Sequence, residues 1–107
     1  MITIIHGEDS VKSRNYYMEL KQKTAGSQTF YGEKILLTDI IQITQGQGLF
    51  NEAPEIFIED LLAKRKPGKE LTSITNYIQE NSQKLHVILW ESKTLTPKTL
   101  QVSTRYL

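Results

Sequence analysis

The chain has 107 residues, a formal net charge of +1 and no cysteine. This length allows one domain with a modest core, and the 38% hydrophobic and 23% charged residues are typical of a globular protein. The charge balance excludes a chain-wide attraction to polyanions, and the lack of cysteine excludes disulfides and cysteine-ligated zinc. No apolar run approaches the roughly 18 residues of a membrane span. Residues 1–7 lack the basic flank and the length of a signal peptide, so we expect a cytoplasmic domain without membrane contact.

Strands and helices are predicted to alternate along the chain. Apolar runs rich in β-branched and aromatic residues predict strands at 2–5, 28–32, 55–60 and 85–91. Apolar residues at helical spacing predict helices from Val11 to Gly26, from Leu36 to Thr44 and from Leu71 to Ile78. Asp9 or Ser10 would cap the first of these helices. A further helix is predicted to start at Pro97, with Thr96 as its cap. Residues 61–70 contain Pro67 and Gly68 and are predicted to form a loop. The order βαβαβαβα predicts a three-layer α/β fold, in which helices flank a mostly parallel sheet.

The segment "IIHGEDSVKS", residues 4–13, has the layout of a phosphate-binding loop, because an apolar strand leads through a glycine to Lys12-Ser13 at a helix start. A working loop has the pattern G-x-x-x-x-G-K-[ST], in which the second glycine lets the backbone close around phosphates. Here four residues separate Gly7 from Lys12, the second glycine is missing, and two carboxylates stand where phosphate oxygens would lie. Gly7, Lys12 and Ser13 therefore form a degenerate loop, and we expect no ATP or other cofactor.

Acidic residues end two of the predicted strands, where sites collect in parallel sheets. The segment "IFIED" is similar to the metal-binding strand of NTPases with its acids in reverse order, and Glu91-Ser92 follows a later strand. Such carboxylates are more often solvated or capping than catalytic. His6 and His86 are far apart in the sequence and the chain has no cysteine, so a metal site is not expected. No Ser-His-Asp arrangement is evident, so nucleophilic catalysis is not expected either.

Three segments in this order carry a family resemblance: "GEDSVKSR" after the first strand, "QGLFNEAPEIFIED" near residue 50, and "LHVILWESKTLTPKTL". The combination is similar to the N-terminal domain of the bacterial DNA polymerase III delta subunit, a part of the clamp loader. The resemblance spans nearly the whole chain, and we expect residues 1–107 to form a single domain. It covers the first of the family's three domains and ends before that domain's last strand, so we expect an open sheet edge and no later domains.

The resemblance implies a degenerate AAA+ domain, related to P-loop NTPases, that does not hydrolyse ATP. It implies no activity of its own, although the family's subunit belongs to the DNA polymerase III holoenzyme, a DNA-directed DNA polymerase. The domain would bind the sliding clamp (the beta subunit) during DNA replication and help to open the ring. A Leu-Phe pair enters an apolar pocket of the clamp in this family. By motif match this pair is Leu49-Phe50, preceded by Gln47 and Gly48. Other clamp-loader subunits would be contacted through domains that this chain lacks.

Two further functions are compatible with the residues alone. One is a small P-loop-like nucleotide-binding protein with an unusual loop, and the other is a generic protein-interaction module in which Leu49 and Phe50 belong to the core. The basic run Lys64, Arg65, Lys66 and Lys69 is a possible site of weak or indirect DNA contact. Such a run is more often a solvated loop.

Overall fold

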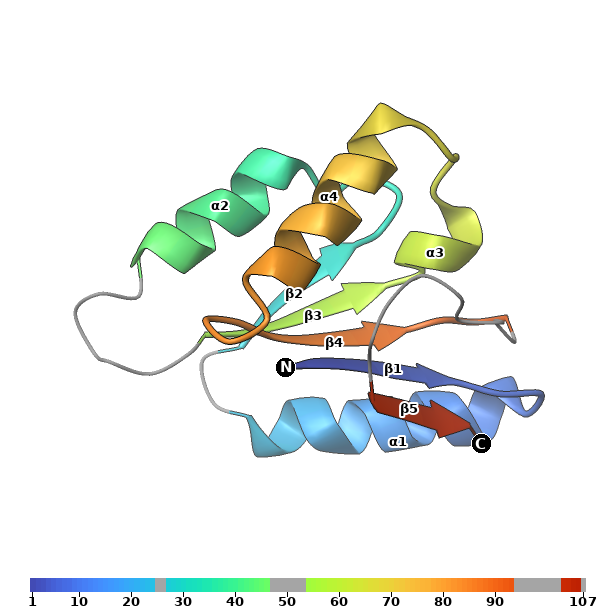
Figure 1. The fold of residues 1–107 in the computed structure, drawn as a ribbon. Helices are drawn as coiled ribbons and strands as arrows, with labels where there is room; N and C mark the ends of the chain where they lie inside the picture. Colours follow the sequence, from blue (N-terminus) through green and yellow to red (C-terminus); the bar gives the residue numbers. More distant parts are fainter. Residues whose placement is uncertain (25–26, 47–53, 94–102, 107) are drawn as a thin grey trace.

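The computed structural model describes residues 1–24, 27–46, 54–93 and 103–106 (Figure 1). The described strands are β1 (Ile2–His6), β2 (Gln28–Tyr31), β3 (Glu55–Glu59), β4 (His86–Trp90) and β5 (Ser103–Tyr106). The described helices are α1 (Ser10–Lys23), α2 (Leu37–Gln45), α3 (Leu61–Lys64) and α4 (Lys69–Glu80). None of these helices is long and apolar enough to cross a membrane.

The five strands form one sheet in the order β2-β3-β4-β1-β5, and every neighbouring pair is parallel. Helix α1 covers one face, whereas α2 and α4 cover the other (Figure 1). The handedness of crossovers explains this division, because the chain runs from β1 to the β2 edge and then returns through β3 to β4. Right-handed connections in opposite directions place their helices on opposite faces. The predicted three-layer, parallel α/β fold is confirmed.

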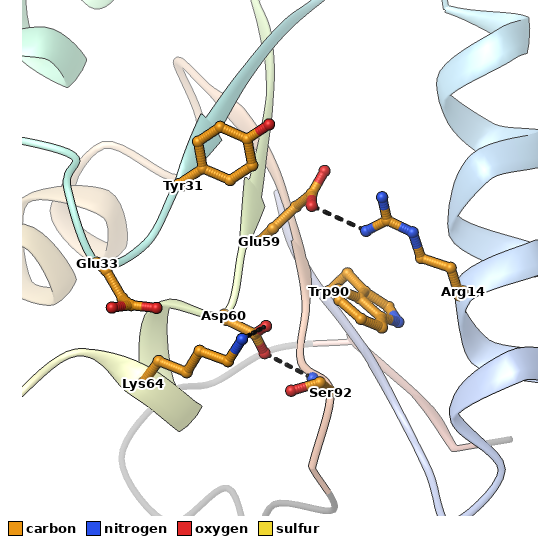
Figure 2. Close-up of a pocket in the computed structure, with 8 residues that line it drawn as sticks. All are labelled: Arg14, Tyr31, Glu33, Glu59, Asp60, Lys64, Trp90 and Ser92. Carbon is orange, nitrogen blue, oxygen red and sulfur yellow. Dashed lines mark hydrogen bonds and ion pairs between the residues drawn. The ribbon is translucent and has the colours of Figure 1, made fainter.

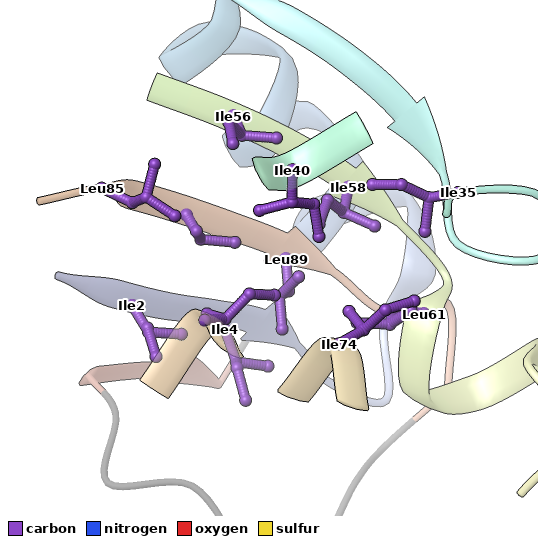
Figure 3. Packing of buried hydrophobic residues seen from close by; sticks show 12 residues of the cluster. Ile2, Ile4, Ile35, Ile40, Ile56, Ile58, Leu61, Ile74, Leu85 and Leu89 are labelled. Carbon is purple, nitrogen blue, oxygen red and sulfur yellow. The ribbon is translucent and has the colours of Figure 1, made fainter. Parts of the chain in front are cut away.

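The larger part of the core lies between the sheet and helices α2 and α4 (Figure 3). It consists mainly of aliphatic side chains that alternate along the strands, as the two-residue period of a strand requires. Its buried members are Ile2, Ile4, Ile35, Ile40, Ile56, Ile58, Leu61, Ile74, Ile78, Leu85, Val87 and Leu89. The opposite face has a smaller buried cluster of Ile5, Tyr17 and Phe57 under α1.

Two details of the chain differ from the sequence-based prediction. The segment predicted as a loop over 61–70 contains the short helix α3 at Leu61–Lys64, and α4 already begins at Lys69. Strand β5 was not predicted, and it pairs with β1, so β1 is an interior strand and not an open edge. The helix predicted to start at Pro97 lies outside the described residues.

Candidate functional site

An open pocket of about 350 Å³ lies at the carboxyl ends of β2, β3 and β4 (Figure 2). Each strand contributes its last residue, and α1 and α3 contribute a basic side chain each. The lining residues are Arg14, Tyr31, Glu33, Glu59, Asp60, Lys64, Trp90 and Ser92. The strand-end residues singled out from the sequence, Glu59-Asp60 and Ser92, therefore do lie together, as expected where parallel strands end at one edge.

Glu59 is the most heavily engaged acid of the pocket. Its Oε1 accepts a hydrogen bond from Arg14 at 2.8 Å, and its Oε2 accepts one from the Tyr17 hydroxyl at 3.1 Å. Lys21 lies 3.8 Å from the same carboxylate. Burial and the neighbouring Glu59 carboxylate raise the pKa of Tyr17, so this hydroxyl remains a donor. The carboxylate is thus held by groups of α1 and is not turned toward a ligand.

Trp90 forms the wall between α1 and the pocket. The Arg14 guanidinium lies 4.7 Å from the Trp90 ring centroid, within the range of a cation–π interaction. Tyr17 stacks against Trp90 with ring centroids 6.0 Å apart, and the indole Nε1 donates to the Ser13 hydroxyl at 3.1 Å. Trp90 thus packs at the edge of the small core under α1, and neighbouring groups use both its ring and its N–H.

Asp60 and Glu91 connect the turn after β3 with the exit of β4. The Asp60 Oδ1 accepts a hydrogen bond from the Ser92 backbone N–H at 2.7 Å, and its Oδ2 lies 3.3 Å from the Lys64 ammonium. The fully buried Glu91 accepts hydrogen bonds from three backbone N–H groups at the start of α3. Both carboxylates therefore have structural partners, as is usual for acids at strand ends.

The residues of the degenerate phosphate loop lie beside the pocket but do not line it. Gly7 has a φ of 155°, which side-chain-bearing residues rarely adopt, and it turns the chain from β1 toward α1. The Asp9 carboxylate accepts a hydrogen bond from the Lys12 backbone N–H at 3.0 Å and caps α1. The Ser13 side chain is fully buried, and its hydroxyl donates to the Ser10 carbonyl while accepting from Trp90. The N-terminus of α1, where a phosphate would bind in a working loop, is thus capped by the carboxylate of Asp9.

The four basic residues of the predicted loop have different roles. Arg65 donates hydrogen bonds from Nη1 to the carbonyls of Gly32 and Ile35, at 3.0 and 2.7 Å, and so fixes the loop between β2 and α2. Lys64 pairs with Asp60. Lys66 and Lys69 are exposed. A DNA contact of this basic run stays a prediction. Of its four residues, Arg65 is the one whose guanidinium donates hydrogen bonds to backbone carbonyls within the domain.

The proposed clamp-binding residues Gln47, Gly48, Leu49 and Phe50 lie outside the described residues. They belong to the connection between α2, which ends at Gln45, and β3, which begins at Glu55. The described residue Glu55, which begins β3, lies at the amino end of the sheet, opposite to the pocket.

Sequence reasoning missed Arg14, Tyr31 and Glu33 as lining residues of the pocket. The available signal for Arg14 was weak: it follows Ser13 on the helix after the degenerate loop, so a helix assignment would place it near the strand ends. Tyr31 ends β2 and is 64% exposed, and Glu33 follows in an exposed turn. Only the strand order brings these residues to one place.

The pocket has three carboxylates and two cations, and both cations are paired with carboxylates. It therefore offers little attraction to a phosphate. In the described part of the chain, no group of three or more His, Cys, Asp or Glu residues is arranged to hold a metal ion. The sequence matches no known family profile, and neither the curated proteins nor the solved structures contain a significant match.

Proposed function

We propose that this chain is a non-catalytic, ATPase-like domain of a clamp-loader delta subunit that binds the sliding clamp through Leu49-Phe50. The observation that supports it best is a parallel three-layer α/β sheet whose loop after β1 is closed by the Asp9 side chain. This is the combination that the resemblance implies: an ATPase-like framework without a phosphate site. The family resemblance in the sequence supplies the partner.

Three contacts argue against nucleotide hydrolysis at the carboxyl end of the sheet. Asp9 occupies the N-terminus of α1, where a phosphate would otherwise be favoured by free N–H groups. The Ser13 hydroxyl is buried and bonded, so it is not available to a magnesium ion. Glu59, which ends β3 where an NTPase holds its metal, is bound by Arg14 at 2.8 Å. A nucleotide would have to break each of these contacts.

The proposed clamp anchor lies between two anchored parts of the fold. On one side α2 packs on the sheet through Ile40, which is fully buried. On the other side the Pro54 carbonyl accepts a hydrogen bond from the His86 N–H at 3.0 Å, which fixes the start of β3 beside β4. Both elements that flank the proposed anchor in the sequence are therefore held by the core.

The anchor alone would bind weakly. Burial of a Leu and a Phe side chain contributes roughly 3 to 6 kcal/mol. Association costs about 4 kcal/mol or more in lost translational and rotational freedom. Neighbouring contacts must add to the pair, and ring opening requires that the domain bind the open clamp more tightly than the closed one. Other loader subunits and DNA would be engaged by the complete subunit.

A titration of the domain against its cognate sliding clamp, by calorimetry or fluorescence anisotropy, tests the proposal. We expect saturable binding by the wild type and its loss in Leu49→Ala/Phe50→Ala with an unchanged melting temperature. Val11→Ala is a matched control, because Val11 is an apolar residue that is 69% exposed on α1. It should leave binding unchanged.

The outcomes separate the alternatives. A double variant that loses several kcal/mol of stability would place Leu49 and Phe50 in the core and remove the residue-level basis of the clamp proposal. Wild-type protein that does not bind the clamp would refute it directly. Saturable binding of a fluorescent ATP analogue, lost in Lys12→Ala, would instead favour the nucleotide-binding alternative.

A further inference from the structure

The pocket at the carboxyl ends of the strands contains one acid more than it contains cations. Its acids are Glu33, Glu59 and Asp60, and its cations are Arg14 and Lys64. Arg14 lies 2.8 Å from Glu59, and Lys64 lies 3.3 Å from Asp60, so these four charges form two pairs. Glu33 is exposed and forms no ion pair with another described residue. The charge of the pocket that has no partner is therefore a carboxylate.

An exposed aromatic ring lies next to this carboxylate. Tyr31 ends β2 and lines the same side of the pocket as Glu33, across from Arg14 (Figure 2). Tyr31 is 64% exposed, and its hydroxyl forms no hydrogen bond with another described residue. In the sheet register Tyr31 is beside Glu59, and Glu59 is beside Trp90. Helix α1 packs over the Trp90 end of this row, so the Tyr31 ring at the other end remains open to a ligand.

The opposite side of the pocket shows which group such a pair can hold. There the Arg14 guanidinium lies 4.7 Å from the Trp90 ring centroid and donates a hydrogen bond to Glu59. A guanidinium thus contacts a ring and a carboxylate at once, which its planar shape and its five N–H donors allow. Tyr31 and Glu33 supply the same two kinds of group, but no cation of the described residues pairs with them.

Other classes of ligand fit this side of the pocket less well. A phosphate or carboxylate would meet the Glu33 charge, whereas both cations of the pocket are already paired. A metal ion needs several ligands, and the described residues hold no group of three or more His, Cys, Asp or Glu arranged for one. An ammonium ion is more strongly hydrated than a guanidinium and cannot lie flat on a ring, so an open pocket favours the guanidinium.

We propose that this side of the pocket binds a guanidinium group, whose face lies on the Tyr31 ring while its N–H groups donate to the Glu33 carboxylate. The pocket is open to solvent, so it admits an arginine side chain of another polypeptide or a small guanidinium compound. Tyr31 and Glu33 are both exposed, so we expect a dissociation constant of about 1–10 mM for a single group. The site is independent of the proposed clamp contact, since it contains none of residues 47–50.

An amide NMR titration of the whole chain tests the site. N-acetyl-L-argininamide is the probe, and N-acetyl-L-lysinamide is the control of equal charge. The arginine probe should cause saturable shift changes at Tyr31 and Glu33, and the lysine control should bind at least about threefold more weakly, because it lacks the planar group. Free L-arginine identifies the source of the ligand: tighter binding than that of the arginine probe supports a free amino acid, and equal or weaker binding supports an arginine within a polypeptide.

Two variants of exposed residues test the assigned contacts. Tyr31→Leu removes the ring but keeps an apolar side chain, and Glu33→Gln removes the charge at nearly constant size. Each should weaken binding of the arginine probe about 3–10-fold without changing the melting temperature. Glu80→Gln is the matched control, because Glu80 is an exposed acid of α4 that does not line the pocket, and it should bind like the wild type. No saturable change, equal affinity for the lysine control, or wild-type affinity in either variant would overturn the proposal.

Discussion

Gly32→Ala is predicted to destabilise the fold strongly, because Gly32 lies directly against the start of α3. An added Cβ would lie 2.3 Å from both the Leu61 Cα and the Leu61 N, and 2.6 Å from the Asp60 carbonyl carbon. Real Cβ atoms essentially never approach other atoms closer than 3.0 Å. These neighbours are backbone atoms, so they cannot rotate away as the end of a flexible side chain would. The variant must shift either the β2–α2 loop or α3.

The cost follows from the contacts that such a shift would break. The Gly32 N–H donates to the Glu59 carbonyl at 2.7 Å, and the Gly32 carbonyl accepts from Arg65 at 3.0 Å. Loss of two hydrogen bonds costs about 1 kcal/mol each, and overpacking adds about 1–3 kcal/mol. A total of about 3–5 kcal/mol is a large share of the roughly 5–15 kcal/mol that stabilises a domain. The melting temperature should fall by at least about 10 °C.

Urea unfolding followed by tryptophan fluorescence and circular dichroism measures this loss, since Trp90 is the single tryptophan of the chain. Gly46→Ala is the matched control: apart from its chain neighbours, no atom of the described residues lies within 4 Å of an added Cβ, and the residue has a right-handed helical backbone with a φ of −77°. This change should be neutral or stabilise by less than about 1 kcal/mol. If Gly32→Ala unfolded within about 0.5 kcal/mol of wild type, the size of an ordinary surface substitution, the close packing of α3 against Gly32 would be refuted.

Three further predictions concern the groups around the pocket. The raised pKa of Glu91 means that the folded state holds its proton more tightly than the unfolded state, so this group's contribution to stability is present below pH 4.5 and is lost as the pH rises to about 7. Urea titrations between pH 4.5 and about 7.5 should show this loss in the wild type relative to Glu91→Gln, and a constant difference between the two proteins would contradict it. Arg65→Met removes two hydrogen bonds to carbonyls and should cost about 2–3 kcal/mol in the same assay, whereas Lys66→Met should cost almost nothing. Arg14→Gln breaks the 2.8 Å contact with Glu59 and the cation–π contact with Trp90, so it should cost about 1–2 kcal/mol and change the tryptophan emission; unchanged emission would contradict the contact.

Local patterns were sufficient to predict most of the sheet. The four strands predicted from short apolar runs correspond to β1 through β4, with bounds that differ by about one residue at either end. Asp9 was one of two predicted caps of the first helix, and it does cap α1. These features depend on residues that are close in sequence, so single-sequence reasoning can find them.

Helix α3 could not be predicted in this way, because its stability comes from distant residues. It has four residues, and Pro67 and Gly68 follow it closely and indicate a loop. Its first N–H groups are satisfied by Glu91, which lies 30 positions after Leu61 in the chain. Strand β5 was likewise missed, since it depends on pairing with β1 at the other end of the sequence.

The candidate site was predictable only in part for a related reason. The rule that sites gather at the carboxyl ends of parallel strands correctly predicts that Glu59, Asp60 and Ser92 lie close together. It could not predict that Arg14 would reach Glu59 from α1, because this contact depends on the packing of the helix over the sheet. The sequence identifies the acids, whereas the fold determines which partners neutralise them.

The partners of the strand-end acids bear directly on what this end of the sheet can do. In a nucleotide-hydrolysing sheet these positions must stay free to bind a metal ion and a water molecule. Here Glu59 is held by Arg14, Asp60 by Ser92 and Lys64, and Glu91 by the first turn of α3. Each contact fixes one element of the fold to another, so the acids contribute to structure where a catalyst would use them for chemistry. The strand-end acids therefore fit a structural role, whereas the residues proposed to contact the clamp fall between α2 and β3 in the sequence.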